Sequence, residues 1–189
     1  MKFIFVSSNI HKFQEVQEIL GDFNLEITFH QQELPELQSE SLEEIALFSA
    51  KYIYPQLQRP LFVEDTGLFI HALNGFPGPY ASYVYKTIGN SGILHLLEGK
   101  NNRTAIFKTA IALTFSETDF KTFLGETQGT IAQIEKGKQG WGYDPIFIPL
   151  EGDQRTYAEM DLHEKNQLSH RRKCLKNMAE WLQKNKPIF

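Results

Sequence analysis

Two adjacent carboxylates close an apolar stretch of this sequence. Glu64 and Asp65 directly follow Leu61–Val63 and precede Thr66 and Gly67. Carboxylates at the end of a buried strand are costly unless water or a cation solvates them. Mg²⁺ uses few carboxylates and takes its other ligands from water and substrate phosphates. The turn is therefore a candidate metal or catalytic site, and its alternative is an ordinary polar strand end.

A second candidate site follows the first apolar run, Phe3–Val6. The polar residues Ser7, Ser8 and Asn9 can cap a helix that carries Lys12 in its first turn. Free backbone N–H groups at a helix start attract anions, and a lysine there opposes the helix dipole unless an anion compensates it. The turn has no Walker signature, so phosphate binding competes with an ordinary cap followed by a solvated lysine.

Two further acidic residues lie upstream of the carboxylate pair. Glu44 stands three residues after Ser41, which is the spacing of a capping box, and capping explains it fully. Glu36 follows Pro35 in a loop and has no evident structural duty. Loop residues of this kind are functional candidates.

The C-terminal third supplies an aromatic residue and several cations. Trp141 stands between glycines in the loop Gly140–Pro145, where it suits either stacking on a planar ring or plugging a hydrophobic gap. Downstream, Ser169 can cap a helix, and His170 and Arg171 can donate hydrogen bonds. Together, a phosphate-binding turn, acidic residues, a stacking aromatic and cationic donors indicate a nucleotide site that uses Mg²⁺.

Strands and helices alternate early in the chain, and a hairpin follows, which predicts a mixed α/β fold. Open α/β sheets bind ligands beyond the carboxyl ends of their strands, where these candidates fall. Helices are predicted after Asn9 as far as Gly21, from Ser41 to a limit at Pro55, over 82–88 and 92–97, and over 169–183. The helix from Ser41 has apolar residues on more than one side and is therefore predicted to be buried. Strands are predicted over 3–6, 25–29, 61–63, 103–115, 120–134 and 146–148.

Length and composition fit one globular domain over residues 1–189. Hydrophobic residues make up 41% and charged residues 22%, values that argue against disorder. The formal net charge is −4, so a broad basic face for nucleic acid is not expected. The single cysteine, Cys174, excludes an internal disulfide framework and fits a cytoplasmic address. No apolar run approaches the ~20 residues of a membrane-spanning helix.

Several sequence blocks, taken in order, resemble the inosine triphosphatase family. This family is also called Ham1-like, or non-canonical purine nucleoside triphosphate pyrophosphatases (dITP/XTP pyrophosphatases). The resemblance covers nearly the whole chain. It rests on Ser7–Lys12, Leu34–Glu36, Val63–Leu68, Leu73–Tyr80, Gly140–Pro145, Thr156–Met160 and Glu164–Arg171.

The resemblance implies an elongated mixed central β-sheet flanked by helices, with two lobes and an active-site cleft between them. It also implies a homodimer and hydrolysis of ITP, dITP and XTP to the monophosphate and pyrophosphate. Such an enzyme would clear these nucleotides from the pool. Mg²⁺ is the expected cofactor, with Mn²⁺ a candidate substitute.

Site roles also follow from the resemblance. Asp65 is the expected catalytic base, and Glu36, Glu64 and Asp65 are the expected metal ligands. The expected substrate contacts are Ser7, Ser8, Asn9, Lys12, Thr66, Trp141, Gly142, Tyr143, Asp144, Lys165, Ser169, His170 and Arg171. Among these, Asn9, Lys12 and Lys165 would contact the triphosphate, Trp141 would stack on the base, and Ser169, His170 and Arg171 would address the base edge.

Three other readings stay open. A Maf-like pyrophosphatase would act on canonical pyrimidine or modified nucleotides, and the Ser169–Arg171 block argues against it. A nucleotide sensor without turnover would be favoured by loss of Glu36 or Asp65, and both are present. A purely structural α/β protein leaves Trp141 and the carboxylate pair unexplained.

Overall fold

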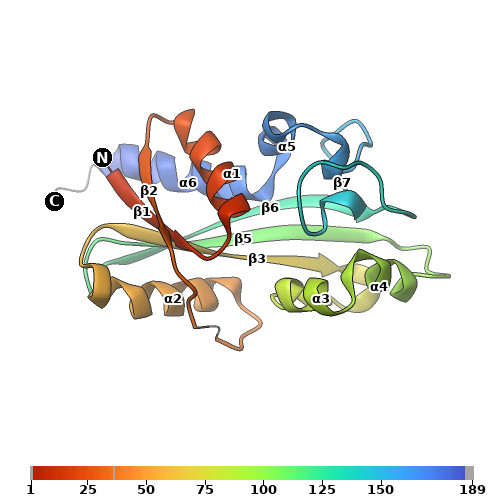
Figure 1. Ribbon diagram of the computed structural model, residues 1–189, viewed down its shortest axis with the longest axis horizontal. Helices are drawn as coiled ribbons and strands as arrows, with labels where there is room; N and C mark the ends of the chain where they lie inside the picture. The colour runs from red at the N-terminus through yellow and green to blue at the C-terminus, as the bar shows by residue number, and fades with distance from the viewer. Residues whose placement is uncertain (1, 36, 186–189) are drawn as a thin grey trace. The chain divides into compact units, whose positions relative to one another are not determined.

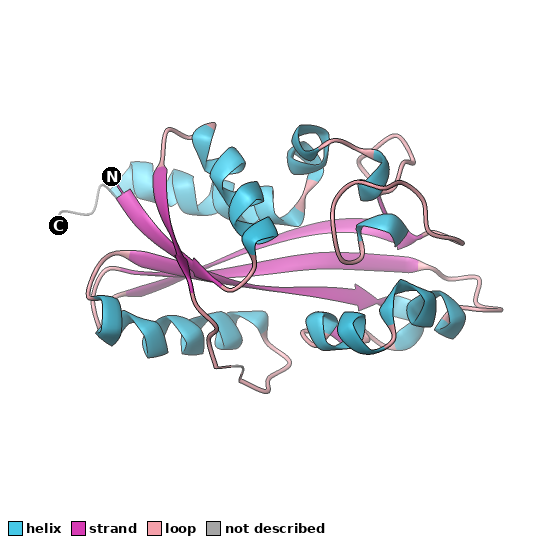
Figure 2. Ribbon diagram, in the orientation of Figure 1, coloured by secondary structure: helices cyan, strands magenta, loops and turns pink. Residues whose placement is uncertain are grey.

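The computed structural model describes residues 2–35 and 37–185, and it is built on one mixed β-sheet. The strand order is β2-β1-β3-β5-β6-β7, and β4 pairs with β3. Helices flank the strands (Figure 2). The strands are β1 Lys2–Ser7, β2 Glu26–Gln31, β3 Leu61–Ile70, β4 Pro77–Gly78, β5 Thr104–Thr114, β6 Phe120–Ile131 and β7 Phe147–Pro149. The predicted mixed α/β class, with helices flanking a central sheet, is confirmed.

The helices occupy most of the stretches where apolar residues recur at helical spacing. They are α1 Ile10–Gly21, α2 Leu42–Leu57, α3 Ala81–Thr87, α4 Gly89–Leu96, α5 Leu162–Leu168 and α6 His170–Asn185, with short 3₁₀ turns at His71–Leu73, Asp144–Ile146 and Tyr157–Glu159. None of the helices within 2–35 and 37–185 is long and apolar enough to cross a membrane.

The chain divides into two compact units. Unit 1 comprises the described residues of Met1–Asp65, Thr109–Gly125 and Arg171–Phe189, and unit 2 comprises Thr66–Lys108 and Glu126–His170. Strands β3, β5 and β6 and helix α6 each contribute residues to both units. The expectation of a single domain over 1–189 stays a prediction.

Unit 1 is built around the parallel strands β1, β2 and β3. Strand β1 pairs with both neighbours, for example Phe5 with Phe29 and with Phe62. Parallel neighbours need a crossover connection, which α1 supplies between β1 and β2. Helices α1 and α6 cover one face of the sheet, and α2 covers the other (Figure 1). The core between the sheet and α1 and α6 contains Phe3, Phe5, Val16, Ile19, Leu20, Phe62, Ile111, Leu113, Cys174, Leu175, Met178 and Leu182.

Helix α2 differs from its prediction in three respects. Its Ser41 cap accepts a hydrogen bond from the Glu44 N–H, but the Ser41 N–H donates to Ser39 Oγ, so the capping box is only half formed. The helix continues through Pro55 to Leu57, because a proline this close to the C-terminus disturbs only the last turns. The helix is also not buried all round, since Phe48 is 40% exposed.

Unit 2 has its own core beside the antiparallel pairs of β3 with β4 and of β6 with β7. Its buried residues come from strands, from α3 and α4, and from the segment after β6. Helix α5 was not predicted, although the capping box of Asp161 and Glu164 marks its start. Ser169 ends α5 and directly precedes the last helix, which begins at His170, one residue later than predicted.

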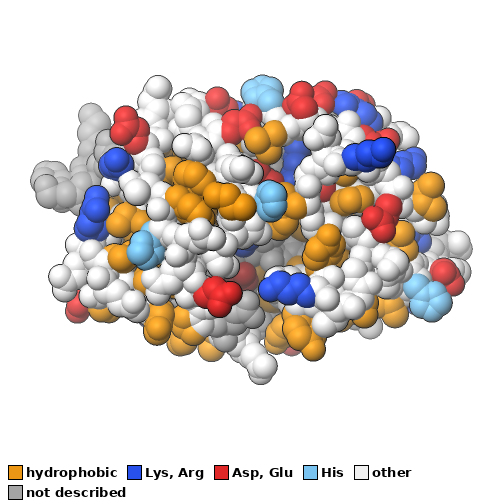
Figure 3. Space-filling model, viewed as in Figure 1, with side chains coloured by type: hydrophobic (Ala, Val, Ile, Leu, Met, Phe, Trp, Pro, Cys, Tyr) orange, Lys and Arg blue, Asp and Glu red, His pale blue; other side chains and the backbone are white. Residues whose placement is uncertain are grey.

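Three strands differ from their predicted bounds. Strand β3 was predicted to end at Val63 before a polar turn, but it continues through Glu64 and Asp65 to Ile70. Strand β6 stops at Ile131, three residues before its predicted end, and β7 begins one residue later than predicted. On the face drawn in Figure 3, acidic, basic and hydrophobic side chains are interspersed among the described residues. This mixture fits the net charge of −4.

Candidate active site

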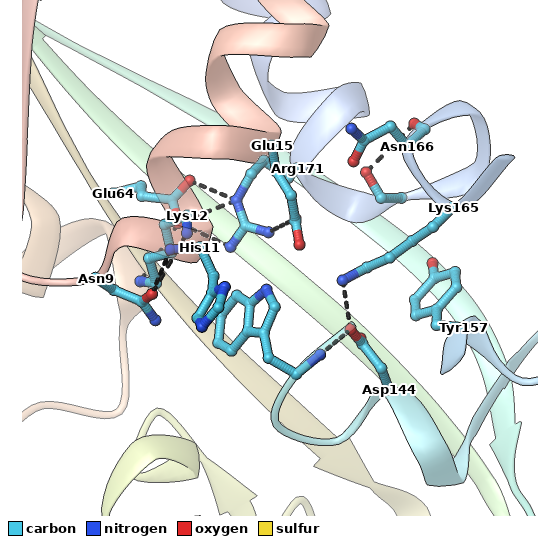
Figure 4. Close-up of polar contacts among 12 residues, drawn as sticks. Asn9, His11, Lys12, Glu15, Glu64, Asp144, Tyr157, Lys165, Asn166 and Arg171 are labelled. Atoms are coloured by element: carbon cyan, nitrogen blue, oxygen red, sulfur yellow. Dashed lines mark hydrogen bonds and ion pairs between the residues drawn. The ribbon is translucent and has the colours of Figure 1, made fainter. Parts of the chain in front are cut away.

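The carboxylate of Glu64 is the centre of a buried ion-pair network in unit 1. The Arg171 Nε donates to both Glu64 oxygens at 3.1 and 2.9 Å, and Arg171 Nη2 donates to Oε1 at 2.8 Å. The Lys12 ammonium lies 3.3 Å from the same Oε1 (Figure 4). Lys12 therefore has a carboxylate partner within the protein.

Arg171 also donates to a second buried carboxylate, that of Glu15 on α1. The Arg171 residue is 1% exposed, and Glu15 is 1% exposed. Burial alone would lower the pKa of the Arg171 guanidinium, but the charges and hydrogen bonds of Glu64 and Glu15 raise it above its ordinary value. Arg171 is thus a fixed cation clamped between two acids.

The electrostatics of Glu64 follow from the same contacts. Burial alone would raise the pKa of its carboxyl group. The charges of Arg171 and Lys12 and the hydrogen bonds from Arg171 outweigh burial, so the pKa lies below its usual value. Glu64 is expected to be ionised at neutral pH. The sequence indicated a metal ligand here, whereas the structure gives this carboxylate two protein cations as partners.

Asp65 is the next residue of β3 and is half-buried. Glu36, the other predicted metal ligand, lies outside the described residues. Within residues 2–35 and 37–185, no group of three or more His, Cys, Asp or Glu side chains is placed to hold a metal ion.

The start of α1 provides backbone N–H groups beside Lys12. Asn9 caps the helix, and its Oδ1 accepts from the N–H groups of His11 and Lys12 at 2.9 and 3.4 Å. Ser7 Oγ accepts from the Asn9 N–H at 3.1 Å, and the first turn contains no acidic residue. This local geometry suits an anion, with Ser8 exposed at the turn.

In unit 2, Asp144 organises the tryptophan loop. Its Oδ2 accepts from the Trp141 N–H at 2.8 Å and from the Lys165 ammonium at 2.6 Å (Figure 4). Gly140, with φ +70°, leaves room for this carboxylate, because a Cβ there would lie 2.2 Å from Asp144 Oδ2. The loop is therefore folded around a buried acid.

Lys165 is buried beneath aromatic rings. Its ammonium lies 5.5 Å from the centre of the Trp141 ring and 5.7 Å from that of Tyr157, and the residue is 4% exposed. These distances fit cation–π attraction. The sequence indicated a triphosphate contact for Lys165, whereas the structure places its charge on Asp144.

The remaining predicted residues of unit 2 are also held by specific contacts. The Tyr143 hydroxyl donates to the Ala81 carbonyl at 2.8 Å, and burial together with nearby Tyr85 raises its pKa. The ring of His170 stacks on Phe107 with centroids 4.7 Å apart. Ser169 Oγ donates to the Asn166 carbonyl, and Thr66, the first residue of unit 2, is half-buried.

The structure thus brings together two groups of predicted residues, one in each unit. Lys12, Glu64 and Arg171 meet in unit 1, and Trp141, Asp144 and Lys165 meet in unit 2. Sequence reasoning missed Glu15 and the aromatic partner Tyr157. A signal for Glu15 existed, because it lies on the helix face of Ile19, one turn after Lys12, and a charge on an apolar stripe indicates a buried ion pair.

Comparison with known proteins decides the family. The family model described as the Ham1 family matches residues 3–181. The chain belongs to the Ham1 family. It is 49% identical over 185 residues to a protein from Methanopyrus kandleri named dITP/XTP pyrophosphatase, with 98% of each chain covered. A protein of the same name from Pyrococcus horikoshii is 48% identical, again with 98% of each chain covered.

Solved structures agree with this membership. The structure of a HAM1 protein from Coxiella burnetii has a TM-score of 0.84 and 31% identity, and the match covers 97% of this chain and 99% of that one. The Staphylococcus aureus Ham1 protein has a TM-score of 0.79 and 26% identity, with 95% and 98% covered. The Ham1 fold therefore extends over nearly the whole chain.

Proposed function

We propose that this protein is a nucleoside triphosphate pyrophosphatase that removes non-canonical purine nucleotides from the cellular pool. Its substrates are dITP, XTP and ITP, and its products are the nucleoside monophosphate and pyrophosphate. The observation that carries the proposal is the 49% identity, over 98% of both chains, to a protein named dITP/XTP pyrophosphatase. The two clusters of charged and aromatic residues agree in type with a nucleotide substrate.

Asp65 is the proposed general base. It accepts a proton from a water molecule as the water oxygen forms a bond to the α-phosphorus. The bond from that phosphorus to the α–β bridging oxygen breaks, and pyrophosphate leaves with the electron pair. General-base catalysis of this kind typically contributes ~10²–10⁴-fold.

Mg²⁺ is the proposed cofactor, and the donor chemistry at Asp65 fits it. A half-buried carboxylate offers hard oxygen ligands, and Mg²⁺ commonly binds proteins through one or two carboxylates. When bound, Mg²⁺ (or Mn²⁺ as a substitute) neutralises charge on the phosphate oxygens. Asp65 and Glu36 are the proposed ligands. Glu64 has two cationic partners already, so its role in the proposal is to hold Lys12 and Arg171.

The start of α1 is the proposed phosphate site. Ser7, Ser8, Asn9 and the Lys12 ammonium supply donors to a group that carries about four negative charges as a triphosphate. The helix dipole adds to the positive potential at this end of α1. The absence of an acidic residue from that turn supports this assignment.

The tryptophan loop is the proposed base site. Trp141 stacks on the purine, beside Gly142, Tyr143 and Asp144. Ser169, His170 and Arg171 are the proposed contacts to the base edge, Thr66 is a further proposed substrate contact, and Lys165 is a proposed contact to the triphosphate. A 6-keto group accepts a hydrogen bond where the 6-amino group of adenine donates, so donors in this set favour hypoxanthine and xanthine. Mismatches of this kind can discriminate by ~10⁴-fold or more.

The proposal also includes a cytoplasmic homodimer. Large aromatic side chains are exposed on and next to α3, with Tyr83 68% exposed and Tyr80 47% exposed. Apolar surface of this kind supports self-association. Light scattering on purified protein measures the oligomeric state directly.

The test of the function is turnover of ITP, XTP, GTP and ATP with and without Mg²⁺, with pyrophosphate and orthophosphate measured separately. Wild type is expected to release pyrophosphate from ITP and XTP only when the metal is present. Asp65→Asn is expected to lose at least 10²-fold in kcat. Asp119→Asn, the same change at an exposed position, is the matched control and should retain full activity.

Three results would contradict this proposal in different ways. Orthophosphate as the product would indicate a different phosphohydrolase. Equal rates on ATP, or activity confined to pyrimidine nucleotides as in a Maf-like enzyme, would overturn the specificity. Tight binding without turnover would indicate a nucleotide sensor.

A further inference from the structure

Asn90 links helix α4 to the tryptophan loop within unit 2. It is the second residue of α4, and its Nδ2 donates to the Gly142 carbonyl at 3.1 Å. The two residues are 52 positions apart in the sequence, so this is a long-range contact. Asn90 is 6% exposed, and its bond to Gly142 is partly buried.

The carbonyl that Asn90 holds belongs to the residue directly after Trp141. Gly142 has φ +63°, a left-handed conformation, and a Cβ at this position would meet nothing within 4 Å. The space around Gly142 therefore does not fix the turn. Asp144 accepts a hydrogen bond from the Trp141 N–H, which precedes the Trp141 side chain along the backbone. Asn90 donates to the Gly142 carbonyl, which follows it. The backbone on both sides of Trp141 is thus tied down by buried side chains.

Only the donor half of the Asn90 amide is used. Its Oδ1 is buried and has no hydrogen-bond partner among residues 2–35 and 37–185. A buried acceptor without a hydrogen bond costs free energy, which offsets what the bond from Nδ2 contributes. A leucine of nearly the same shape would avoid that cost. Global stability therefore does not explain an asparagine here, and local rules are most often broken at functional sites.

We propose that Asn90 is a positioning residue that fixes the Trp141–Gly142 turn and so holds the indole ready to stack on the purine base. The stacking step rests on the function proposed above, whereas the fixing of the turn does not. Positioning of this kind acts on substrate binding, since a pre-ordered ring need not be ordered when the base arrives.

The test uses Asn90→Leu in a Trp181→Phe background, in which Trp141 is the only tryptophan. Leucine keeps the approximate shape and removes both the donor and the unsatisfied acceptor. We expect the melting temperature to stay within about 4 °C of the parent, which corresponds to a small stability change for a chain of this size. Without nucleotide, the acrylamide quenching constant of Trp141 should rise. With ITP, KM should rise on the order of tenfold with kcat nearly unchanged, the pattern of lost uniform binding.

Asn90→Asp is the second variant, because it keeps the shape and acceptor but has no donor when ionised. It should raise the quenching constant as well. The matched control is Asn177→Leu in the same background. Asn177 makes a hydrogen bond of the same type, from its Nδ2 to the Leu124 carbonyl at 2.8 Å, but this bond is exposed and lies in unit 1. It should leave Trp141 quenching and KM at the parent values.

Parent-like quenching and KM in Asn90→Leu would overturn the proposal. A large fall in melting temperature with KM unchanged would also overturn it, because that is the signature of a purely structural contact. If the parent enzyme turned over no nucleotide, the proposed function would fail. The quenching comparison would still decide whether Asn90 fixes the loop.

Discussion

Four charged side chains in the interior of unit 1 compensate one another: Arg171, Glu64, Glu15 and Lys12. Two carboxylates face two cations, and Arg171 engages both acids through separate nitrogens. A buried ion is tolerated only when partners replace its water, and removing one partner typically costs 3–5 kcal/mol, since the other charge is left uncompensated. Each member therefore depends on the others.

The lowered pKa of Glu64 predicts how stability changes with pH. Because its pKa in the folded protein lies below the unfolded value, its contribution is fully present above about pH 4.5 and is lost as pH falls through the folded pKa. At pH 7 the free energy of unfolding of Glu64→Gln should be about 3 kcal/mol lower than that of wild type. The difference from wild type should shrink below pH 4.5. Urea titrations from pH 3 to pH 7 measure both quantities.

The control for this prediction is Glu117→Gln, the same change at an exposed residue. Its unfolding free energy should stay within ±0.5 kcal/mol of wild type at pH 7, as is usual for surface substitutions. A Glu64→Gln difference that stayed constant down to pH 3 would show that lost packing, and not ionisation, causes the destabilisation.

The sequence identified which residues belong to the candidate site better than it identified the contacts that those residues make. Glu64 and Arg171 were both singled out, one as a metal ligand and the other as a contact to the base. They are 107 residues apart, and the bond between them depends on the placement of α6 beside the part of β3 that lies within unit 1. Spacing along the chain carries no signal for such a contact. For Asn90 there was no signal at all, since an asparagine after a glycine is an ordinary helix start.

Among the elements, the loop Gly140–Asp144 carries the most specific geometry. A loop over Gly140–Pro145 was predicted from the glycines around Trp141. The structure has no helix or strand before Asp144, where a 3₁₀ turn replaces the last two residues of the predicted loop. The buried Asp144 that organises it could not be predicted, because an aspartate before a proline is typical of an exposed turn. Helix α5, which supplies Lys165, was missed even though its capping box was visible in the sequence.

Gly140→Ala tests whether this loop depends on its glycine. The added Cβ would lie 2.2 Å from Asp144 Oδ2, at a φ of +70° that alanine rarely adopts. Strain of about 1–3 kcal/mol and displacement of Asp144 are expected. The variant should therefore bind ITP more weakly, with KM raised about tenfold or more, and should melt at a lower temperature.

Gly99→Ala provides the comparison for Gly140→Ala. Gly99 has a similar φ of +70°, but a Cβ there would meet nothing within 4 Å. It should show the conformational cost in its melting temperature and keep the wild-type KM. Equal KM values for the two variants would mean that the contact between Gly140 and Asp144 does not control the loop.

At the scale of the whole molecule, the chain passes between the two units four times. The passages lie at Asp65/Thr66, Lys108/Thr109, Gly125/Glu126 and His170/Arg171. They fall within β3, within β5, within β6 and within α6. Domain boundaries usually lie in flexible linkers with few contacts. The α/β class could be predicted from the alternation of strands and helices. The division into two units could not, because composition does not change along a strand that contributes residues to the cores of both units.

This connectivity predicts that the two units unfold together. A unit cannot lose its strands without disrupting the hydrogen-bonded elements that continue into the other, so one cooperative transition is expected. The protein has two tryptophans, Trp181 in unit 1 and Trp141 in unit 2. Trp141→Phe leaves a probe of unit 1, and Trp181→Phe leaves a probe of unit 2.

In each single-tryptophan variant, the urea transition seen by fluorescence should coincide with the transition seen by far-ultraviolet circular dichroism. The comparison is made within each variant because either substitution can shift stability by itself. If the fluorescence midpoint of one variant preceded its dichroism midpoint, that unit would unfold first. The strands and helix shared by the two units would then not couple them, and nucleotide-binding residues could be lost from one unit while the other stayed folded.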